Sequence, residues 1–114
     1  MDLEKKQEAC CAHYSAGFLP PDAMQLVVIS DGVLLGEHEV EGVRYPSPDH
    51  MSGWWLTTSL YSGNLESLKT VHFTHIAAAL PNIAQYMGLP HGYRFVLGGQ
   101  SEHVWFDSEV AKGV

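Results

Sequence analysis

His72 and His75 have the clearest metal-ligand spacing in the chain. They lie three positions apart in a segment that suits the start of a helix, so both imidazoles can share one face. A zinc site needs a third and a fourth ligand, for which His91 and Asp49 are candidates. No HExxH or CxxC motif accompanies the pair. The missing motif favours the alternative, in which His72 flanks or caps the helix and His75 packs partly buried.

A cysteine nucleophile is the second candidate chemistry, because Cys10 and Cys11 stand together and histidines occur elsewhere in the chain. Such a nucleophile requires a lowered thiol pKa and an oriented base. Cys10 lies within a predicted helix close to Glu8, whose carboxylate would raise the thiol pKa instead. The pattern therefore favours two small residues packed on a helix. Adjacent cysteines rarely form a disulfide, so two free thiols in a reducing compartment are expected.

Glu37, Glu39 and Glu41 alternate along the chain, so their carboxylates point to one side if the segment is extended. Asp49 lies a short loop away. Paired carboxylates support acid–base catalysis when one of them is buried in an apolar pocket, but the flanking residues do not predict burial. Two interpretations remain: a solvated sheet edge that resists aggregation, and an acidic docking strip for a basic protein.

Trp54 and Trp55 point to opposite faces if they lie in a strand. Both rings cannot enter the core of a sheet that is covered on one side only. The outward ring is either covered by the N-terminal helix or exposed as an interface anchor, a role for which Trp is well suited. Tyr45 and Tyr61 bracket the same strand and could widen an aromatic patch.

The composition is that of a globular domain and argues against several kinds of partner. The chain has 114 residues, 46% apolar and 17% charged, with 13 acidic and 6 basic residues and a formal charge of −7. This length suits one domain, residues 1–114. Its charge disfavours nucleic acid and anionic membranes and favours a basic protein partner. The N-terminus lacks a secretory signal and no segment approaches the ~20 apolar residues of a membrane span, so we expect a cytoplasmic protein.

The pattern of segments predicts an α+β fold with a mainly antiparallel sheet. Residues 2–16 suit a helix that Gly17 can end. Residues 73–80 carry the apolar stripe of a second helix, and Pro81 either ends it or opens a short third one. The N-terminal helix and one or two helices are expected to pack on one face of the sheet. The predicted strands cover residues 26–30, 33–35, 42–45, 54–59, 93–97 and 103–106, with hairpins between 33–35 and 42–45 and between 93–97 and 103–106.

A series of short motifs carries a family resemblance. It comprises Ile29-Ser30-Asp31, Gly42-Val43-Arg44-Tyr45, Asp49, Ser52-Gly53-Trp54, His75-Ile76-Ala77, Pro81-Asn82-Ile83, Tyr86-Met87 and Pro90-His91-Gly92-Tyr93-Arg94-Phe95. In this order, residues from about 27 to 107 resemble the bacterial immunity protein 33-like domain of polymorphic toxin systems. Residues 26–107 would form the immunity-like core, and residues 1–25, a helix and its connection, lie outside the resemblance. The chain departs from the family pattern at Trp55, where a polar residue is common, and at residues 62–66, where an acidic run is common.

The resemblance implies an immunity protein that binds and neutralises a cognate bacterial toxin in a tight protein–protein complex, the toxin being encoded by an adjacent gene. Neither catalysis nor a cofactor would be involved. The residues expected to contact the partner are Glu37, Glu39, Glu41, Asp49, Trp55 and Tyr61. An exposed Trp face would also allow a homodimer. Two alternatives stay open: a small metal-binding protein or enzyme that uses His72, His75 and His91, and a regulatory binding module whose partner is not a toxin.

Overall fold

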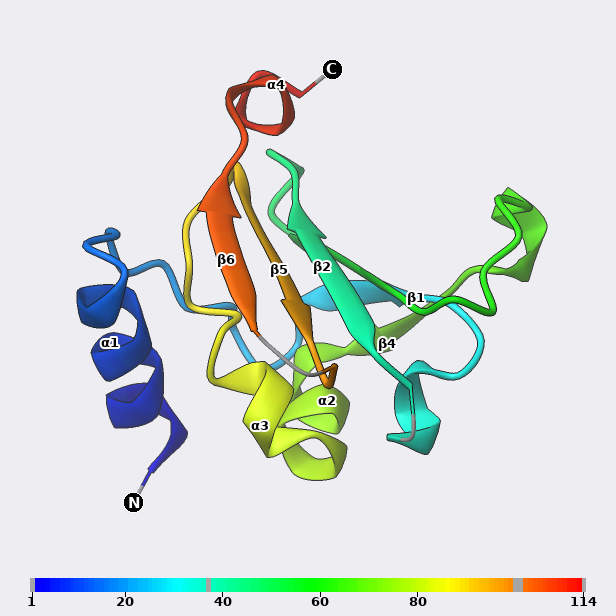
Figure 1. The fold of residues 1–114 in the computed structure, drawn as a ribbon, viewed down its shortest axis with the longest axis horizontal. Coiled ribbons are helices and arrows are strands. Elements are labelled where there is room, and N and C mark those ends of the chain that lie inside the picture. Colours follow the sequence, from blue (N-terminus) through cyan, green and yellow to red (C-terminus); the bar gives the residue numbers. More distant parts are fainter. Residues whose placement is uncertain (1, 37, 100–101, 114) are drawn as a thin grey trace.

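The computed structural model describes residues 2–36, 38–99 and 102–113, which form a six-stranded sheet with helices (Figure 1). The strands are β1 (Leu26–Ile29), β2 (Val40–Arg44), β3 (Met51–Thr57), β4 (Lys69–His72), β5 (Tyr93–Leu97) and β6 (His103–Phe106). The helices are α1 (Leu3–His13), α2 (Phe73–Ala79), α3 (Pro81–Ala84) and α4 (Ser108–Ala111), with 3₁₀ helices η1 (Val33–Leu35) and η2 (Leu65–Ser67).

The strands lie in the order β4-β1-β3-β2-β5-β6. Four of the neighbouring pairs are antiparallel, and β1 with β3 is parallel. The predicted α+β class with a mainly antiparallel sheet is therefore confirmed. The parallel pair was not expected, because it joins strands that the connection through β2 separates in the sequence.

Two predicted local features are corrected by the structure. Residues Val33–Leu35 form the 3₁₀ helix η1 and not a strand, so the expected hairpin with residues 42–45 is wrong. Gly32 and Gly36 bracket η1 with φ angles of 91° and 73°, a left-handed geometry that ends extended structure on either side. Strand β2 pairs instead with β3 and β5.

Helix α1 begins and ends through local hydrogen bonds. The Asp2 side chain accepts from the Lys5 backbone N–H and caps the first turn. The helix ends earlier than predicted, because Ser15 takes a left-handed φ of 55°. The Ala16 N–H then donates to the Cys11 carbonyl oxygen, which closes the helix as Gly17 was expected to do.

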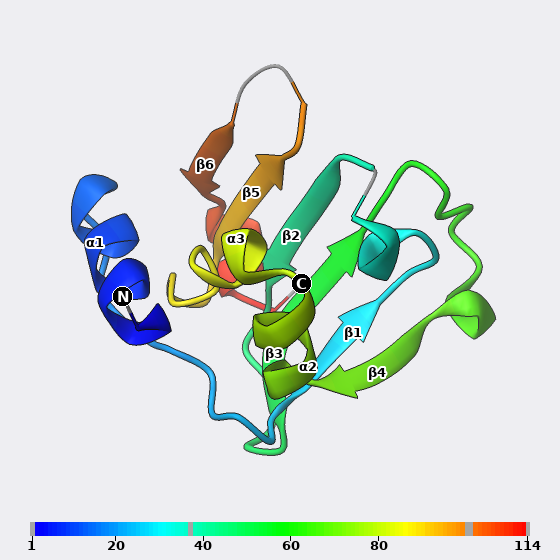
Figure 2. The same cartoon turned by 90° about the horizontal axis from the view of Figure 1, so that it is seen from below.

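One face of the sheet carries the core, and α2 and α3 cover it (Figure 2). Alternation along β3 sends Trp54 and Leu56 into this core, where both are fully buried. The Trp54 ring packs against Phe95 of β5 with centroids 5.1 Å apart, and its Nε1–H donates to the Met87 carbonyl oxygen at 2.8 Å. The short helix α4 lies on the opposite side of the sheet, behind it in Figure 2, and contacts β2.

A buried arginine links the sheet to two connecting segments. Arg44, only 2% exposed, is the last residue of β2. Its guanidinium donates to the carbonyl oxygens of Leu19, Ser52, Met87 and Leu89. These acceptors come from the connection after α1, from β3 and from the loop before β5, so one side chain fixes three distant segments. None of the helices among the described residues has the length and apolar character needed to span a bilayer.

Candidate functional site

The sheet face opposite α2 and α3, which we call the open face and on which only the short helix α4 contacts β2 among the described helices, carries a continuous row of side chains. Residues directly opposite each other on paired strands point to the same side of a sheet. The register pairs Val28 with Trp55, Trp55 with Val43, Val43 with Arg94, and Arg94 with Trp105. These five residues therefore cross five neighbouring strands in one row, roughly 19 Å long at the usual strand spacing.

The row has an aromatic centre at Trp55. This ring is partly exposed and meets the Tyr45 ring edge-on, with centroids 6.1 Å apart and planes at 76°. Val43 lies beside it on β2 and is also partly exposed. Gly53 takes a φ of 89° at the bulge in β3 next to Trp55, a geometry that glycine permits. Any other residue would also place its Cβ against the Tyr45 carbonyl oxygen. The Tyr45 N–H also donates to the Gly53 carbonyl oxygen at 2.9 Å, which brings the backbone of Tyr45 against β3.

Arg94 anchors the other half of the open face. Its guanidinium donates to Glu41 on β2 and to Asp107 after β6, each at 3.0 Å, and stacks on Trp105 at 5.3 Å from the ring centroid. Burial lowers the pKa of Arg94, but its hydrogen bonds to the two carboxylates outweigh burial and raise the pKa overall. The hydrogen bond from Arg94 also lowers the pKa of Asp107. The charges on this half of the face are therefore fixed: one cation between two anions.

The structure separates the residues expected to contact a partner. Glu41 and Trp55 lie on the open face, and Trp55 points away from the buried Trp54, as the alternation of the two rings predicted. Glu39 and Tyr61 are found at one end of the strands, because β2 starts where β3 ends. Glu39 lies against the Gly98-Gly99 turn, and Tyr61 follows β3 in a turn closed by Thr58. Asp49 is exposed in the β2–β3 loop at the opposite end. Glu37 falls outside the described residues.

Arg94 and Trp105 were missed as open-face residues. Period-two alternation in residues 93–97 and 103–106 puts them on the side away from Phe95 and Val104, so the signal was present. That Arg94 and Trp105 share a face with Trp55 could not be predicted from neighbouring residues, because it depends on the pairing of β2 with β5.

The histidines proposed as metal ligands do not converge. The His72 and His75 rings are stacked with centroids 6.1 Å apart. His91 lies elsewhere, beside Arg44, and burial followed by that cation lowers its pKa. Across the described ranges 2–36, 38–99 and 102–113, no three His, Cys, Asp or Glu side chains gather as a metal site.

The adjacent cysteines are both free thiols. Burial is the main reason that the pKa of Cys10 rises to about 12, with Cys11 and Glu102 adding to it. Burial also raises the pKa of Cys11, against the lowering effect of Arg44. A nucleophilic cysteine needs the opposite shift, so the structure supports the packing role for both residues.

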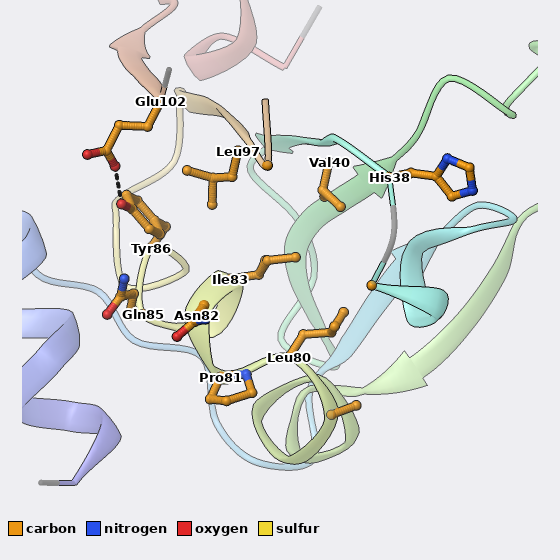
Figure 3. Close-up of a pocket in the computed structure, with 13 residues that line it drawn as sticks. His38, Val40, Leu80, Pro81, Asn82, Ile83, Gln85, Tyr86, Leu97 and Glu102 are labelled. Carbon is orange, nitrogen blue, oxygen red and sulfur yellow. Dashed lines mark hydrogen bonds between the residues drawn. The ribbon is translucent and has the colours of Figure 1, made fainter. Parts of the chain in front are cut away.

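A cavity of about 520 Å³ opens on the helix-covered side, between α3 and the ends of β2 and β5 (Figure 3). Its apolar lining includes Val40, Leu80, Ile83 and Leu97. At its rim the Tyr86 hydroxyl donates to Glu102, and burial followed by this bond raises the Tyr86 pKa well above its usual value. A protonated phenol bound to a carboxylate is a structural contact and not an activated base.

The family model of the Imm33-like domain matches residues 6–107. This range starts within α1, further towards the N-terminus than the motif resemblance, and ends at the residue after β6. Comparison with curated proteins and with solved structures gave no match. The match covers all six strands, most of α1 and the helices α2 and α3, and the chain belongs to the Imm33-like domain family.

Proposed function

We propose that this protein is an immunity protein that binds and neutralises a cognate bacterial toxin by forming a tight protein–protein complex. Membership of the Imm33-like domain family is the observation that carries the proposal. In this proposal the protein acts by fitting its partner and not by catalysis. The bound protein either covers the active site of the toxin or holds the toxin in an inactive shape.

The open face is the surface that we assign to the toxin. Trp55 offers a partly exposed aromatic side chain that Tyr45 holds in place, and such rigid aromatic anchors dominate many interfaces. Glu41 is beside it, with its side chain 47% exposed and already paired with Arg94. A basic side chain of the toxin can join this pair from solvent.

The charge of the chain supports a basic partner. With a formal charge of −7, the protein attracts cationic groups, and at physiological salt this attraction is screened beyond about 8 Å. Glu39 and Tyr61 at one end of the strands and Asp49 at the other end are proposed to form the rim of the toxin footprint around Trp55 and Glu41. Glu37 is proposed as a further contact from its sequence pattern alone. Rim charges change the rate of association more than the rate of dissociation.

Calorimetric titration with the toxin domain encoded beside the gene tests the assignment. Trp55→Ala is expected to weaken binding by about 2 kcal/mol, or roughly thirtyfold. Phe18→Ala is the matched control, because Phe18 is 38% exposed on the connection after α1 and packs near Gly88. Equal affinity of Trp55→Ala and wild-type protein would remove Trp55 from the interface, and no binding by the wild-type protein would refute the function.

A further inference from the structure

Three exposed leucines gather at one end of the sheet, where β1 and β3 end and β2 begins. Leu34 and Leu35, both in η1, are 41% and 65% exposed, and Leu60, which follows β3, is 52% exposed. The Leu60 side chain lies against the start of η1, because a Cβ at Gly32 would be 2.9 Å from Leu60 Cδ1. Large apolar side chains that are exposed together mark interaction sites more often than single ones do. These leucines are therefore candidates for an interface.

The same end of the sheet holds the cavity of about 520 Å³ (Figure 3). Gly36, which ends η1, is part of the cavity wall, and a Cβ at this glycine would lie 3.7 Å from Leu80 Cδ2. The exposed η1 therefore leads directly into the apolar lining. The volume lies in the range of pockets that hold small ligands, so the cavity has room for a side chain of another molecule. We call η1, Leu60 and the cavity together the end surface.

The end surface has an acidic rim. Asp31 directly precedes η1, Glu39 directly precedes β2, and Glu102 lines the cavity; all three residues are exposed. Among the described residues, none of these carboxylates forms an ion pair with Lys or Arg. Glu102 also borders a separate hollow against α1, which Lys6 lines, and Lys69 lies on β4, three strands or about 14 Å from β2. The cavity itself is lined by neither Lys nor Arg, so the rim attracts basic groups from outside.

We propose that the end surface binds a segment of the toxin that is apolar on one side and carries Lys or Arg on its flanks. One apolar side chain of this segment enters the cavity, others cover Leu34, Leu35 and Leu60, and the basic side chains meet the acidic rim. The inference rests on the proposed function. It extends the toxin footprint from the open face over the end of the strands, where Glu39 and Tyr61 lie.

Charge and shape favour a basic protein segment over other occupants. A second copy bound around a two-fold axis would gather Asp31, Glu39 and Glu102 with the same carboxylates of its partner, and like charges brought together disfavour association. A small ligand in the cavity would leave the leucines of η1 exposed. A protein segment with Lys or Arg covers the leucines, fills the cavity and offsets part of the formal charge of −7.

Titration of wild-type protein and matched variants with the toxin domain encoded beside the gene tests the inference. Leu35→Ser should weaken binding about tenfold, because it removes an apolar contact of η1. Leu65→Ser is the matched control and should bind as wild type does. Leu65 is 68% exposed and also lies in a 3₁₀ helix, η2, which Figures 1 and 2 both show apart from η1 and α3.

Two further pairs of variants test the cavity and the rim. Ala79→Arg should weaken binding about tenfold or more, because Ala79 is exposed and lines the cavity, and the new side chain brings bulk and positive charge to it. Ala78→Arg, at the neighbouring exposed position of α2 outside the lining, should have little effect. Asp31→Lys should slow association about threefold or more, whereas Glu66→Lys, the same change of charge at an exposed position in η2, should not.

Methyl-resolved NMR of the wild-type protein gives a measurement that needs no variant. Ile83 lines the cavity and is partly buried, so its methyl signals should shift when the toxin domain is added. The methyl signals of Leu65 should stay in place. Urea denaturation of each variant shows whether a loss of binding reflects a loss of folding.

Three results would overturn the inference. In the first, wild-type protein binds the toxin domain and Trp55→Ala weakens binding, but Leu35→Ser, Ala79→Arg and Asp31→Lys bind as wild type does and the Ile83 signals do not move; the proposed function then stands without this surface. In the second, wild-type protein does not bind, which refutes the proposed function and this inference together. In the third, the Ile83 signals shift with protein concentration alone, which assigns the end surface to a second copy.

Discussion

Replacing Arg44 by methionine is expected to destabilise the fold strongly while keeping most of the buried volume. Arg44 lies at the end of β2 and is 2% exposed. Its guanidinium has carbonyl oxygens as acceptors, three of them at 2.5–2.8 Å, from Leu19, Ser52 and Leu89. A fourth acceptor, the Met87 carbonyl, lies at 3.4 Å and also receives the Trp54 N–H. Methionine supplies no donor to any of them.

The size of the effect follows from the acceptors left behind. A buried acceptor that loses its donor costs about 1–3 kcal/mol, so three of them give about 3–9 kcal/mol. Burial of the charge works in the opposite direction and lowers the pKa of Arg44 to about 10. Removing that charge relieves part of the cost, and we expect a net loss of about 3–5 kcal/mol. Arg44→Lys should lose about 2 kcal/mol, because an ammonium cannot reproduce the planar fork of donors.

Urea denaturation followed by tryptophan fluorescence measures both losses. Lys69→Met, at an exposed position of β4, is the control and should stay within about 0.5 kcal/mol of wild type. A loss below about 1 kcal/mol for Arg44→Met would contradict the reasoning, since the three carbonyl oxygens would then be satisfied without the guanidinium. Equal stability of Arg44→Lys and wild type would show that the fork geometry is irrelevant.

Three further predictions concern separate parts of the structure. Gly42→Ala should destabilise the protein by about 1–3 kcal/mol, because the new Cβ would overlap the Phe95 ring; urea denaturation checks this, and an unchanged midpoint would contradict it. Cys10, whose pKa burial raises to about 12, should react with iodoacetamide near pH 8 roughly a thousandfold more slowly in native than in urea-unfolded protein; equal rates by peptide mass spectrometry would refute this. Asp107→Asn should be less stable than wild type at neutral pH and equally stable in acid, because the hydrogen bond from Arg94 lowers the pKa of Asp107 in the folded state. The stabilisation by the Asp107 carboxylate is therefore present above the pKa of the unfolded state and is lost as the pH falls through the pKa of the folded state. A stability difference that does not change with pH would contradict this.

The sequence predicted correctly those features of the strands that depend on residues close together in the chain. Alternation placed Trp54 and Trp55 on opposite faces of the strand, and the structure has Trp54 buried and Trp55 partly exposed. The hairpin of β5 with β6 was predicted from two apolar runs around Gly98-Gly99 and is observed. In each case the residues that fix the geometry are neighbours in the sequence.

Features that depend on distant pairing were not predictable in this way. Strand β4 has no apolar run, and it is a strand because β1 pairs with all four of its residues. The parallel pair of β1 with β3 and the position of β2 between β3 and β5 also join segments from different parts of the chain. For the same reason the sequence indicated Trp55 and Glu41 as surface residues but not that Arg94 and Trp105 share their face.

Rescue of growth shows whether this chain protects a cell by binding a toxin. Bacteria would express the toxin domain encoded beside the gene, alone or with this protein, at matched soluble levels of each variant. We predict full growth with wild-type protein and with Phe18→Ala, and reduced growth with Trp55→Ala. Growth arrest that the wild-type protein fails to relieve, with no complex recovered from those cells, would contradict the claim.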